Sequence, residues 1–142
     1  MFSKSCQYAI RAILFLAIYT SEDRRMGVDD LAAKLEVPKH FLAKVLQQLT
    51  RQNLIASAKG RNGGFYLTTE NRNSNLLAVI ESIDGPHAFH ECILGMSKCS
   101  NENPCPYHSA VRHYRDQFLL LVREETIQES AERIVLNNLK IL

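Results

Sequence analysis

Apolar residues recur at helical spacing in three runs over the first fifty positions of the chain. The longest run, residues 8–19, is nearly continuously apolar and predicts a well-buried first helix. Its most apolar part, residues 12–19, is far shorter than the roughly 20 residues that a membrane helix needs. No charged-then-apolar leader precedes it. We therefore expect a cytoplasmic protein with no membrane partner. The side of this helix expected to be buried carries Tyr8, Ala12, Leu16 and Tyr19.

The next two runs predict a pair of short helices joined by a tight turn. Asp29 and Asp30 favour a helix start through the macrodipole, and this helix is expected to end near Glu36. Pro38 fits the first turn of the following helix. Two helices joined in this way predict a helix-turn-helix, a motif that also occurs in proteins that never touch DNA. The apolar stripe of the second helix is Phe41, Leu42, Val45, Leu46 and Leu49.

A basic hairpin is predicted directly after this helix pair. Residues 55–58 and 65–68 have strand character, and the intervening sequence Lys-Gly-Arg-Asn-Gly-Gly contains glycines that permit the positive backbone angles of a turn. The alternative of a nucleotide phosphate cradle is disfavoured, because the segment has neither the P-loop pattern nor G-x-G-x-x-G. In a winged helix-turn-helix, the second helix lies in the major groove and the wing reaches the neighbouring phosphates or minor groove. The candidate DNA-binding residues are Lys39, His40, Lys44, Lys59, Gly60 and Arg61.

The distribution of charge supports this interpretation. The 142 residues carry a net charge of +2, but residues 1–75 contain 11 Lys and Arg against 6 Asp and Glu, whereas residues 76–142 contain 6 against 9. Residues 34–72 contain seven cations and two anions. Such asymmetry is typical of a surface that follows phosphates, although an ordinary solvated face could also produce it.

Two further helical segments are predicted, with a long loop before the second. Ser74 can cap a helix that continues to Ile83, and residues 87–106 then form a loop of about twenty residues, a length usually associated with function. Thr126 and Glu129 match a capping box and predict a short final helix. Between the loop and that helix, apolar residues recur at steps of three and four, which favours a homodimer seam over packing within one chain. The seam residues are Val111, Tyr114, Phe118 and Leu121.

Three cysteines and a histidine crowd into this loop, in the pattern Cys92-x6-Cys99-x5-Cys105-x2-His108. In a reducing compartment, such residues favour a metal site over disulfides. Soft thiolates with an imidazole suit an iron-sulfur cluster or zinc, and the wide spacings fit structural zinc poorly. Unligated loop cysteines are the remaining alternative. Cys6 stands apart and is expected to be buried. His87 and His90 flank the loop and are expected to be solvated, with a role as substitute ligands as the alternative.

Taken together, these motifs resemble the IscR-type regulators of iron-sulfur cluster biogenesis, in the superfamily that also contains the nitric-oxide sensor NsrR and the cysteine regulator CymR. The resemblance covers nearly the whole chain, and implies that Cys92, Cys99, Cys105 and His108 ligate a 2Fe-2S cluster, with a 4Fe-4S cluster as the alternative. It departs in the first cysteine gap, x6 where x5 is expected, and at Tyr8, where NsrR-like members are expected to have an acidic ligand nearby. The motifs that carry it are Tyr8-Ala9, Leu31-Ala32, Leu54-Ile55, residues 59–67 and the Cys/His set.

We therefore expect a mainly α fold: a winged helix-turn-helix domain with a small β-hairpin wing and a long C-terminal dimerisation helix. The expected parts are a DNA-binding domain (1–84), a cluster-binding loop (85–108), and a dimerisation helix with a short C-terminal helix (109–142). The expected function is a transcriptional repressor, not an enzyme, that binds a palindromic double-stranded operator as a homodimer. Its DNA binding would respond to redox, nitric oxide or iron-sulfur status, without a small-molecule substrate. The alternatives are a cluster-free, CymR-like regulator controlled by a partner protein, a zinc-stabilised protein-interaction module, and a ferredoxin-like electron carrier, which the basic wing disfavours.

Overall fold

The computed structural model describes residues 1–141, which form seven helices and one two-stranded antiparallel hairpin. The fold is mainly α, as predicted, and none of the helices in this part of the chain is both long and apolar enough to cross a membrane. In chain order the elements are α1 (Lys4–Tyr19), α2 (Val28–Leu35), α3 (Lys39–Arg51), β1 (Ala56–Ala58), β2 (Gly64–Tyr66), α4 (Thr69–Asn73), α5 (Leu76–Asp84), α6 (His108–Glu124) and α7 (Ile127–Leu136).

Helix α1 runs through the middle of the molecule and begins four residues before the apolar run. Ser3 caps it, since its Oγ accepts a hydrogen bond from the Cys6 amide over 3.0 Å. Cys6 is fully buried, as predicted. Tyr19 is exposed at the last turn, so the prediction that it shares the buried side with Leu16 is wrong. The helix ends where Thr20 turns extended and its hydroxyl donates to the Leu16 carbonyl over 2.6 Å.

Helices α2 and α3 form the predicted helix-turn-helix. Glu36 takes a left-handed conformation (φ 54°, ψ 48°), which turns the chain between them. Pro38 stands at the N-cap of α3, just before the first turn in which it was expected. Phe41 is 48% exposed, so it does not belong to the buried stripe, which keeps Leu42, Val45, Leu46 and Leu49.

The wing is a short hairpin in which Ser57 of β1 stands opposite Phe65 of β2. Its strands have three residues each, shorter than predicted, and Ile55 and Leu67, which flank them, are buried in the core. Gly64 has φ +142°, and a Cβ there would lie 2.7 Å from the carbonyl carbon of Met26. Met26 pairs with Phe65, so the turn after α1 approaches β2 too closely for a side chain at Gly64.

One short helix was not predicted, and one predicted cap is wrong. Thr68 and Asn71 form a capping box that begins α4, a five-residue helix. Ser74 therefore ends α4, and it is Asn75 whose Oδ1 caps α5 by accepting from the Ala78 amide over 3.0 Å. Arg72, counted above among the cations of the basic surface, points inward instead. Its guanidinium donates to the carbonyls of Ala17 and Thr20 over 2.7 Å and so satisfies the end of α1.

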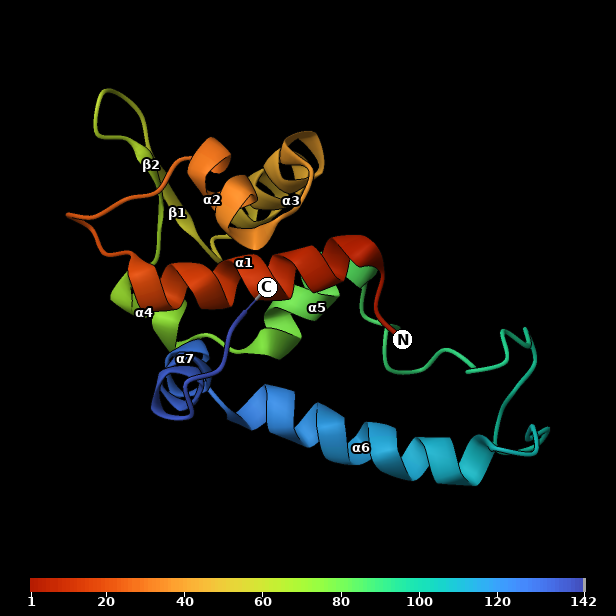
Figure 1. The fold of residues 1–142 in the computed structure, drawn as a ribbon. Helices are drawn as coiled ribbons and strands as arrows, with labels where there is room; N and C mark the ends of the chain where they lie inside the picture. The colour runs from red at the N-terminus through yellow and green to blue at the C-terminus, as the bar shows by residue number, and fades with distance from the viewer. Residues whose placement is uncertain (142) are drawn as a thin grey trace.

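One core joins the N-terminal helices to the last helix. Ile127 and Ala131 of α7 belong to the same buried cluster as Ile13 and Leu46. Figure 1 shows α2, α3 and the hairpin on one side of α1, and α7 and α6 on the other. The predicted capping box at the start of α7 is confirmed, with both Thr126 and Glu129 hydrogen bonds present. Among the residues of α6, Val122 alone is buried, so this helix lies largely outside the core.

Candidate metal centre and nucleic-acid interface

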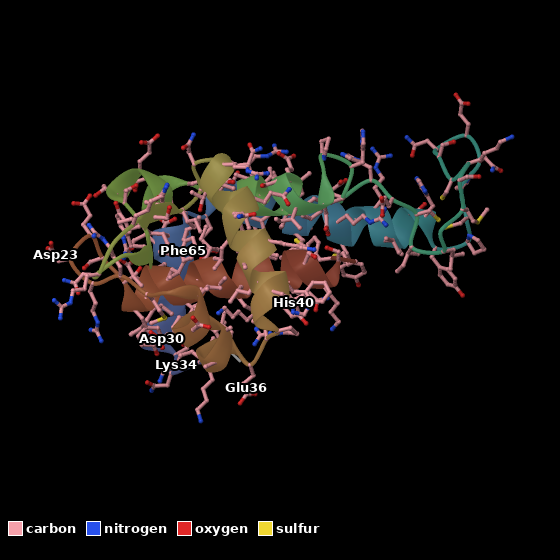
Figure 2. The ribbon with its side chains drawn as sticks, turned by 90° about the horizontal axis from the view of Figure 1, so that it is seen from above. Asp23, Asp30, Lys34, Glu36, His40 and Phe65 are labelled. Carbon is pink, nitrogen blue, oxygen red and sulfur yellow. The ribbon has the colours of Figure 1, made fainter. Side chains whose placement is uncertain are left out.

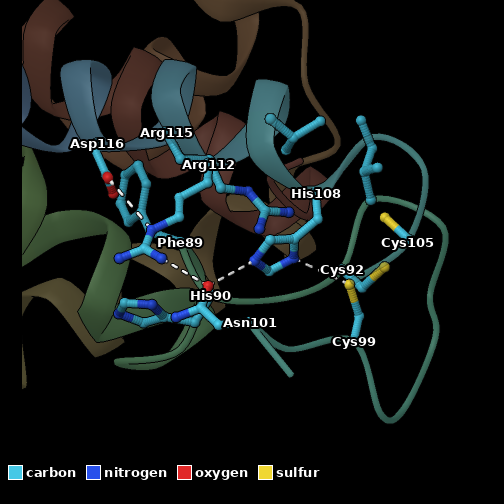
Figure 3. Close-up of a pocket in the computed structure, with 12 residues that line it drawn as sticks. Phe89, His90, Cys92, Cys99, Asn101, Cys105, His108, Arg112, Arg115 and Asp116 are labelled. Atoms are coloured by element: carbon cyan, nitrogen blue, oxygen red, sulfur yellow. Dashed lines mark hydrogen bonds and ion pairs between the residues drawn. The ribbon is translucent and has the colours of Figure 1, made fainter. Parts of the chain in front are cut away.

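The long loop before α6 folds its three cysteines together. Tight turns bend the chain around the Cys92 carbonyl, which accepts from the Gly95 amide over 2.9 Å, and around the Cys105 carbonyl, which accepts from the His108 amide over 3.0 Å. As a result, the Sγ atoms of Cys92, Cys99 and Cys105 all lie within 4.8 Å of one another (Figure 3). Cys105 is buried and the other two are half-buried. Residues thirteen positions apart in sequence thus form one compact thiol group.

His108 stands beside this group as the first residue of α6. Its Nδ1 lies 3.2 Å from Cys99 Sγ, and its Nε2 lies 3.1 Å from Asn101 Oδ1. It is at the edge of the thiol group, because the set of atoms mutually within 4.8 Å contains the three sulfurs alone. His87 is exposed, as expected, and His90 lines the same pocket of about 280 Å³ on the other side of Asn101 from the thiols (Figure 3).

The donor set fits a thiophilic metal centre. A tetrahedral ion with bonds of about 2.3 Å to sulfur holds its sulfurs about 3.8 Å apart, and the three thiols here lie within 4.8 Å. Three thiolates and an imidazole are donors that iron-sulfur clusters and zinc accept, whereas hard cations prefer oxygen. Cys92, Cys99, Cys105 and His108 are therefore the residues of this loop that could hold such a group.

The surroundings of the thiols affect their ionisation unequally. The backbone amide of Met96 lowers the pKa of Cys92, because its hydrogen bond favours the thiolate. The backbone at Cys105 acts in the same sense on Cys99, but loss of hydration and the two neighbouring thiols outweigh it and raise the pKa of Cys99. Cys92 is thus the member of the pair that ionises more readily.

The pocket has a polar wall that sequence reasoning missed. Arg112 Nη1 donates to Asn101 Oδ1 over 2.7 Å, and Arg112 Nε lies 3.8 Å from Asp116 Oδ2. The spacing of Arg112 four residues after His108 could have indicated that both share a helix face. No comparable signal marks Asn101, which reaches the pocket through the path of the loop.

An aromatic cluster connects the loop to the rest of the molecule. The Phe89 ring lies 5.7 Å from that of Phe2 and 6.0 Å from that of Phe118, centroid to centroid. Phe89 also lines the pocket beside the thiols, and it packs in a small buried cluster with Cys6 and Ile80. The start of α1, the end of α5, and α6 therefore meet at the first turn of the loop.

The candidate DNA-contacting residues lie on the opposite side of the molecule from α6. Figure 2 looks onto that side, with His40 at the beginning of α3. Lys39 and Lys44 are exposed, and Lys39 Nζ forms an ion pair with Asp29 over 2.5 Å. The wing tip projects on this same side (Figure 1), and its Lys59, Gly60 and Arg61 are all exposed.

A further cation stands beside the wing. Arg25, in the turn after α1, stacks its guanidinium 5.1 Å from the centre of the Tyr66 ring of β2. The pairing of Met26 with Phe65 brings this turn to the edge of the hairpin. The two consecutive arginines, Arg24 and Arg25, could have indicated this cation from the sequence. The structure adds Arg25 to the basic side of the wing.

The proposed seam residues are distributed along one exposed side of α6. Tyr114 is 74% exposed and Leu121 is 47% exposed, while Val111 is half-buried. Phe118 differs, because part of its ring contacts the aromatic cluster with Phe2 and Phe89. An isolated chain therefore presents a row of apolar side chains on this helix to solvent.

Comparisons with known proteins agree with this architecture. A family model described as "Rrf2: Iron-dependent Transcriptional regulator" matches residues 2–133. A putative HTH-type transcriptional regulator of Aquifex aeolicus is 30% identical over 131 residues, covering 91% of this chain and 90% of the relative. The regulator NsrR of Geobacillus kaustophilus is 25% identical over 127 residues, covering 89% and 86%.

Two solved structures are similar over almost their full length. The global cysteine regulator CymR of B. subtilis superposes with a TM-score of 0.74 at 18% identity, covering 94% of this chain and 97% of that chain. T. potens IscR superposes with a TM-score of 0.68 at 16% identity, covering 94% and 87%. These likenesses confirm the winged helix-turn-helix fold.

Proposed function

Because the chain belongs to the Rrf2 family of iron-dependent transcriptional regulators, we propose that it represses transcription by binding a palindromic operator as a homodimer, under the control of an iron-sulfur cluster. The observation that carries this proposal is the convergence of Cys92, Cys99 and Cys105 beside His108, at the start of the helix with the exposed apolar row. The three functional parts are residues 1–84 for DNA, 85–108 for the cluster, and 109–142 for dimerisation.

The cysteine loop is the part that holds the cluster. Cys92, Cys99 and Cys105 provide three thiolates, and His108 provides the fourth ligand, which favours a 2Fe-2S cluster over the alternative 4Fe-4S type. When bound, such a cluster supplies a redox-active centre that oxidants and nitric oxide can damage. The half-burial of Cys92 and Cys99 leaves this side of the loop open to small molecules.

The helix-turn-helix and the wing divide the DNA contacts between them. Lys39, His40 and Lys44 lie on the first turns of α3, where side chains of a recognition helix reach base edges in the major groove. Lys59, Gly60 and Arg61 contact phosphates or the minor groove at the wing tip. Both sets are exposed on the same side of the molecule, which supports their acting on one duplex.

Dimerisation links the two sites. The row Val111, Tyr114, Phe118 and Leu121 pairs with the same row of a second chain, and the geometry of that pairing sets the spacing of the two α3 helices. His108 is the first residue of the same helix, so ligation there orders the start of the seam. Cluster binding and operator binding are then coupled, because both depend on the position of α6.

The decisive experiment measures metal and DNA on the same preparation. Protein purified without oxygen is analysed for iron and acid-labile sulfide, and its operator is selected from a random double-stranded library. We expect about two iron and two sulfide per chain for the 2Fe-2S form, and an operator affinity that changes when the cluster is removed. Absence of iron and sulfide, or equal affinity with and without the cluster, would contradict the proposal.

A second candidate function is a cluster-free regulator controlled by a partner protein. The fold that this chain shares with CymR, with a TM-score of 0.74, is equally compatible with such a function. It predicts colourless protein that still selects a palindromic operator. Zinc in place of iron, with no salt-sensitive DNA binding, would instead indicate a zinc-stabilised interaction module.

A further inference from the structure

Asn101 and Arg112 form a hydrogen-bonded pair against His108, on the side of its ring that faces away from the thiols (Figure 3). Asn101 belongs to the loop segment between Cys99 and Cys105, whereas Arg112 and His108 lie four residues apart on α6. One oxygen, Asn101 Oδ1, lies 2.7 Å from Arg112 Nη1 and 3.1 Å from His108 Nε2. The loop is thus fastened to the helix at the imidazole.

This arrangement fixes which nitrogen of His108 carries the proton. A guanidinium can only donate, so Arg112 requires the oxygen of the Asn101 amide, rather than its NH2 group, to face it. That oxygen can only accept, so His108 Nε2 must carry the hydrogen of their contact. In a neutral imidazole, Nδ1 then has no hydrogen, and its lone pair faces Cys99 Sγ, 3.2 Å away.

We propose that Asn101 and Arg112 are positioning residues that select Nδ1 of His108 as its metal-ligating nitrogen. The inference rests on the proposed function in one respect, that His108 is a ligand. Histidines that bind metals generally donate their other ring N–H to an acceptor, which fixes the tautomer and the orientation of the ring. Here the acceptor is itself held by a cation, so the imidazole is oriented before any metal arrives.

The first test reads the tautomer in the metal-free full-length protein. Long-range 1H–15N correlation spectra are recorded with 15N-labelled histidine, and His108→Ala identifies the signals of His108. We expect the Nε2–H tautomer in the wild type, a mixture in Asn101→Ala, and the wild-type tautomer in Asn101→Asp, which keeps an acceptor oxygen. An Nδ1–H tautomer in the wild type, or an unchanged tautomer in Asn101→Ala, would overturn the proposal.

The matched control is Asn103→Ala in the same loop. Asn103 also donates to a loop carbonyl, that of Lys98, over 3.0 Å, but its described hydrogen bonds do not include His108. This variant removes a side-chain hydrogen bond within the same loop, and we expect it to keep the wild-type tautomer. If Asn103→Ala disturbs His108 as much as Asn101→Ala does, loop order rather than the specific contact is responsible, and the proposal fails.

The second test measures binding of Co²⁺ to the metal-free protein without oxygen, followed through its thiolate absorption. Removal of a partner of this kind typically weakens metal binding about 10- to 100-fold. We expect that loss in Asn101→Ala, recovery in Asn101→Asp, and no loss in Asn103→Ala. Equal affinity of Asn101→Ala and the wild type would overturn the proposal. Absence of iron and sulfide from the purified protein would refute the proposed function instead, and the tautomer and the cobalt affinity would still decide this inference.

Discussion

The helical body and the cysteine loop of this chain are held in shape by different means. The body buries an apolar core around α1, and its helix ends are satisfied by its own side chains, such as Arg72 at the end of α1. The loop from 85 to 107 has neither helix nor strand, and it leaves Ile93 61% and Leu94 52% exposed. The loop brings its three cysteine sulfurs together. Hydrophobic burial therefore holds the body and reaches the start of the loop at Ala88 and Phe89, whereas we expect residues 90–107 to depend on what their thiols bind.

The largest expected effect comes from the same substitution made in each region. Cys105→Ala removes a buried thiol of the loop, and we expect it to abolish cluster binding while leaving the unfolding free energy of the metal-free body unchanged. Cys6→Ala removes a buried thiol of the body, and we expect it to keep the cluster but to destabilise the fold by about 1 kcal/mol. Iron and sulfide analysis and urea unfolding measure the two effects.

The opposite results for the two variants would contradict this comparison of the body with the loop. If Cys105→Ala destabilised the metal-free protein as much as Cys6→Ala, residues 90–107 would have to belong to the hydrophobic core as well. Burial raises the pKa of Cys6 to about 12, with the nearby Asp84 acting in the same direction, so this thiol stays protonated and is a poor ligand at neutral pH.

The second prediction concerns α6, which connects the two regions. Tyr114→Glu combined with Leu121→Glu places like charges along the proposed seam, where each large apolar side chain contributes about 1.5–3 kcal/mol when buried. We expect monomers and a loss of affinity for a palindromic operator of more than about 100-fold. Phe118 is spared because its ring also contacts Phe2 and Phe89.

Sedimentation of the protein measures the dimer directly. Gln117→Glu adds a charge to an exposed α6 position outside the predicted seam and serves as the control. We expect this variant to remain a dimer. A Tyr114→Glu, Leu121→Glu protein that still sediments as a dimer would place the interface elsewhere.

The sequence predicted the body better than the loop, and the reason is physical. Periodicity of apolar residues revealed α1, α2 and α3, because a buried helix face requires apolar residues. Glycine spacing revealed the hairpin, because a turn with positive backbone angles favours glycine. The wing and cysteine motifs also identified the relatives correctly, since the chain is a member of the superfamily that they resemble. Helix α4 was not predicted, because its five residues depend on a capping box rather than on apolar residues at helical spacing.

The errors have a common origin in tertiary contacts. Arg72 looked like a surface cation, but it satisfies carbonyls at the end of α1, which lies more than fifty residues earlier in the sequence. Phe41 and Tyr19 fit helical spacing but lie at element edges, where the core does not reach. In the loop, spacing indicated which side chains share a site, but not that Asn101 would stand behind His108, because no periodicity governs an irregular chain.

The third prediction contrasts leucines of the two regions. Leu46→Ala empties a fully buried position of α3, and such changes typically cost 2–5 kcal/mol because the cavity relaxes only partly. Leu94→Ala changes an exposed position of the loop, where we expect a change of less than about 0.5 kcal/mol. Urea unfolding of the metal-free proteins checks both values. A loss of more than about 1 kcal/mol in Leu94→Ala would show that the loop shares in the stability of the body.

The smallest expected effect compares cations of the two regions. Lys59→Ala with Arg61→Ala removes the charges of the wing tip, and we expect the slope of log affinity against log salt to fall by about one unit for each phosphate that is no longer neutralised. Lys98→Ala removes an exposed cation of the cysteine loop and serves as the control, with an unchanged slope expected. Because interactions with phosphates carry no sequence information, the wing variant should weaken binding to specific and random duplexes by similar factors. The measurement is a salt titration of operator binding by fluorescence anisotropy. An unchanged slope in the double variant, or an equal decrease in Lys98→Ala, would mean that the wing does not provide the electrostatic interaction assigned to it.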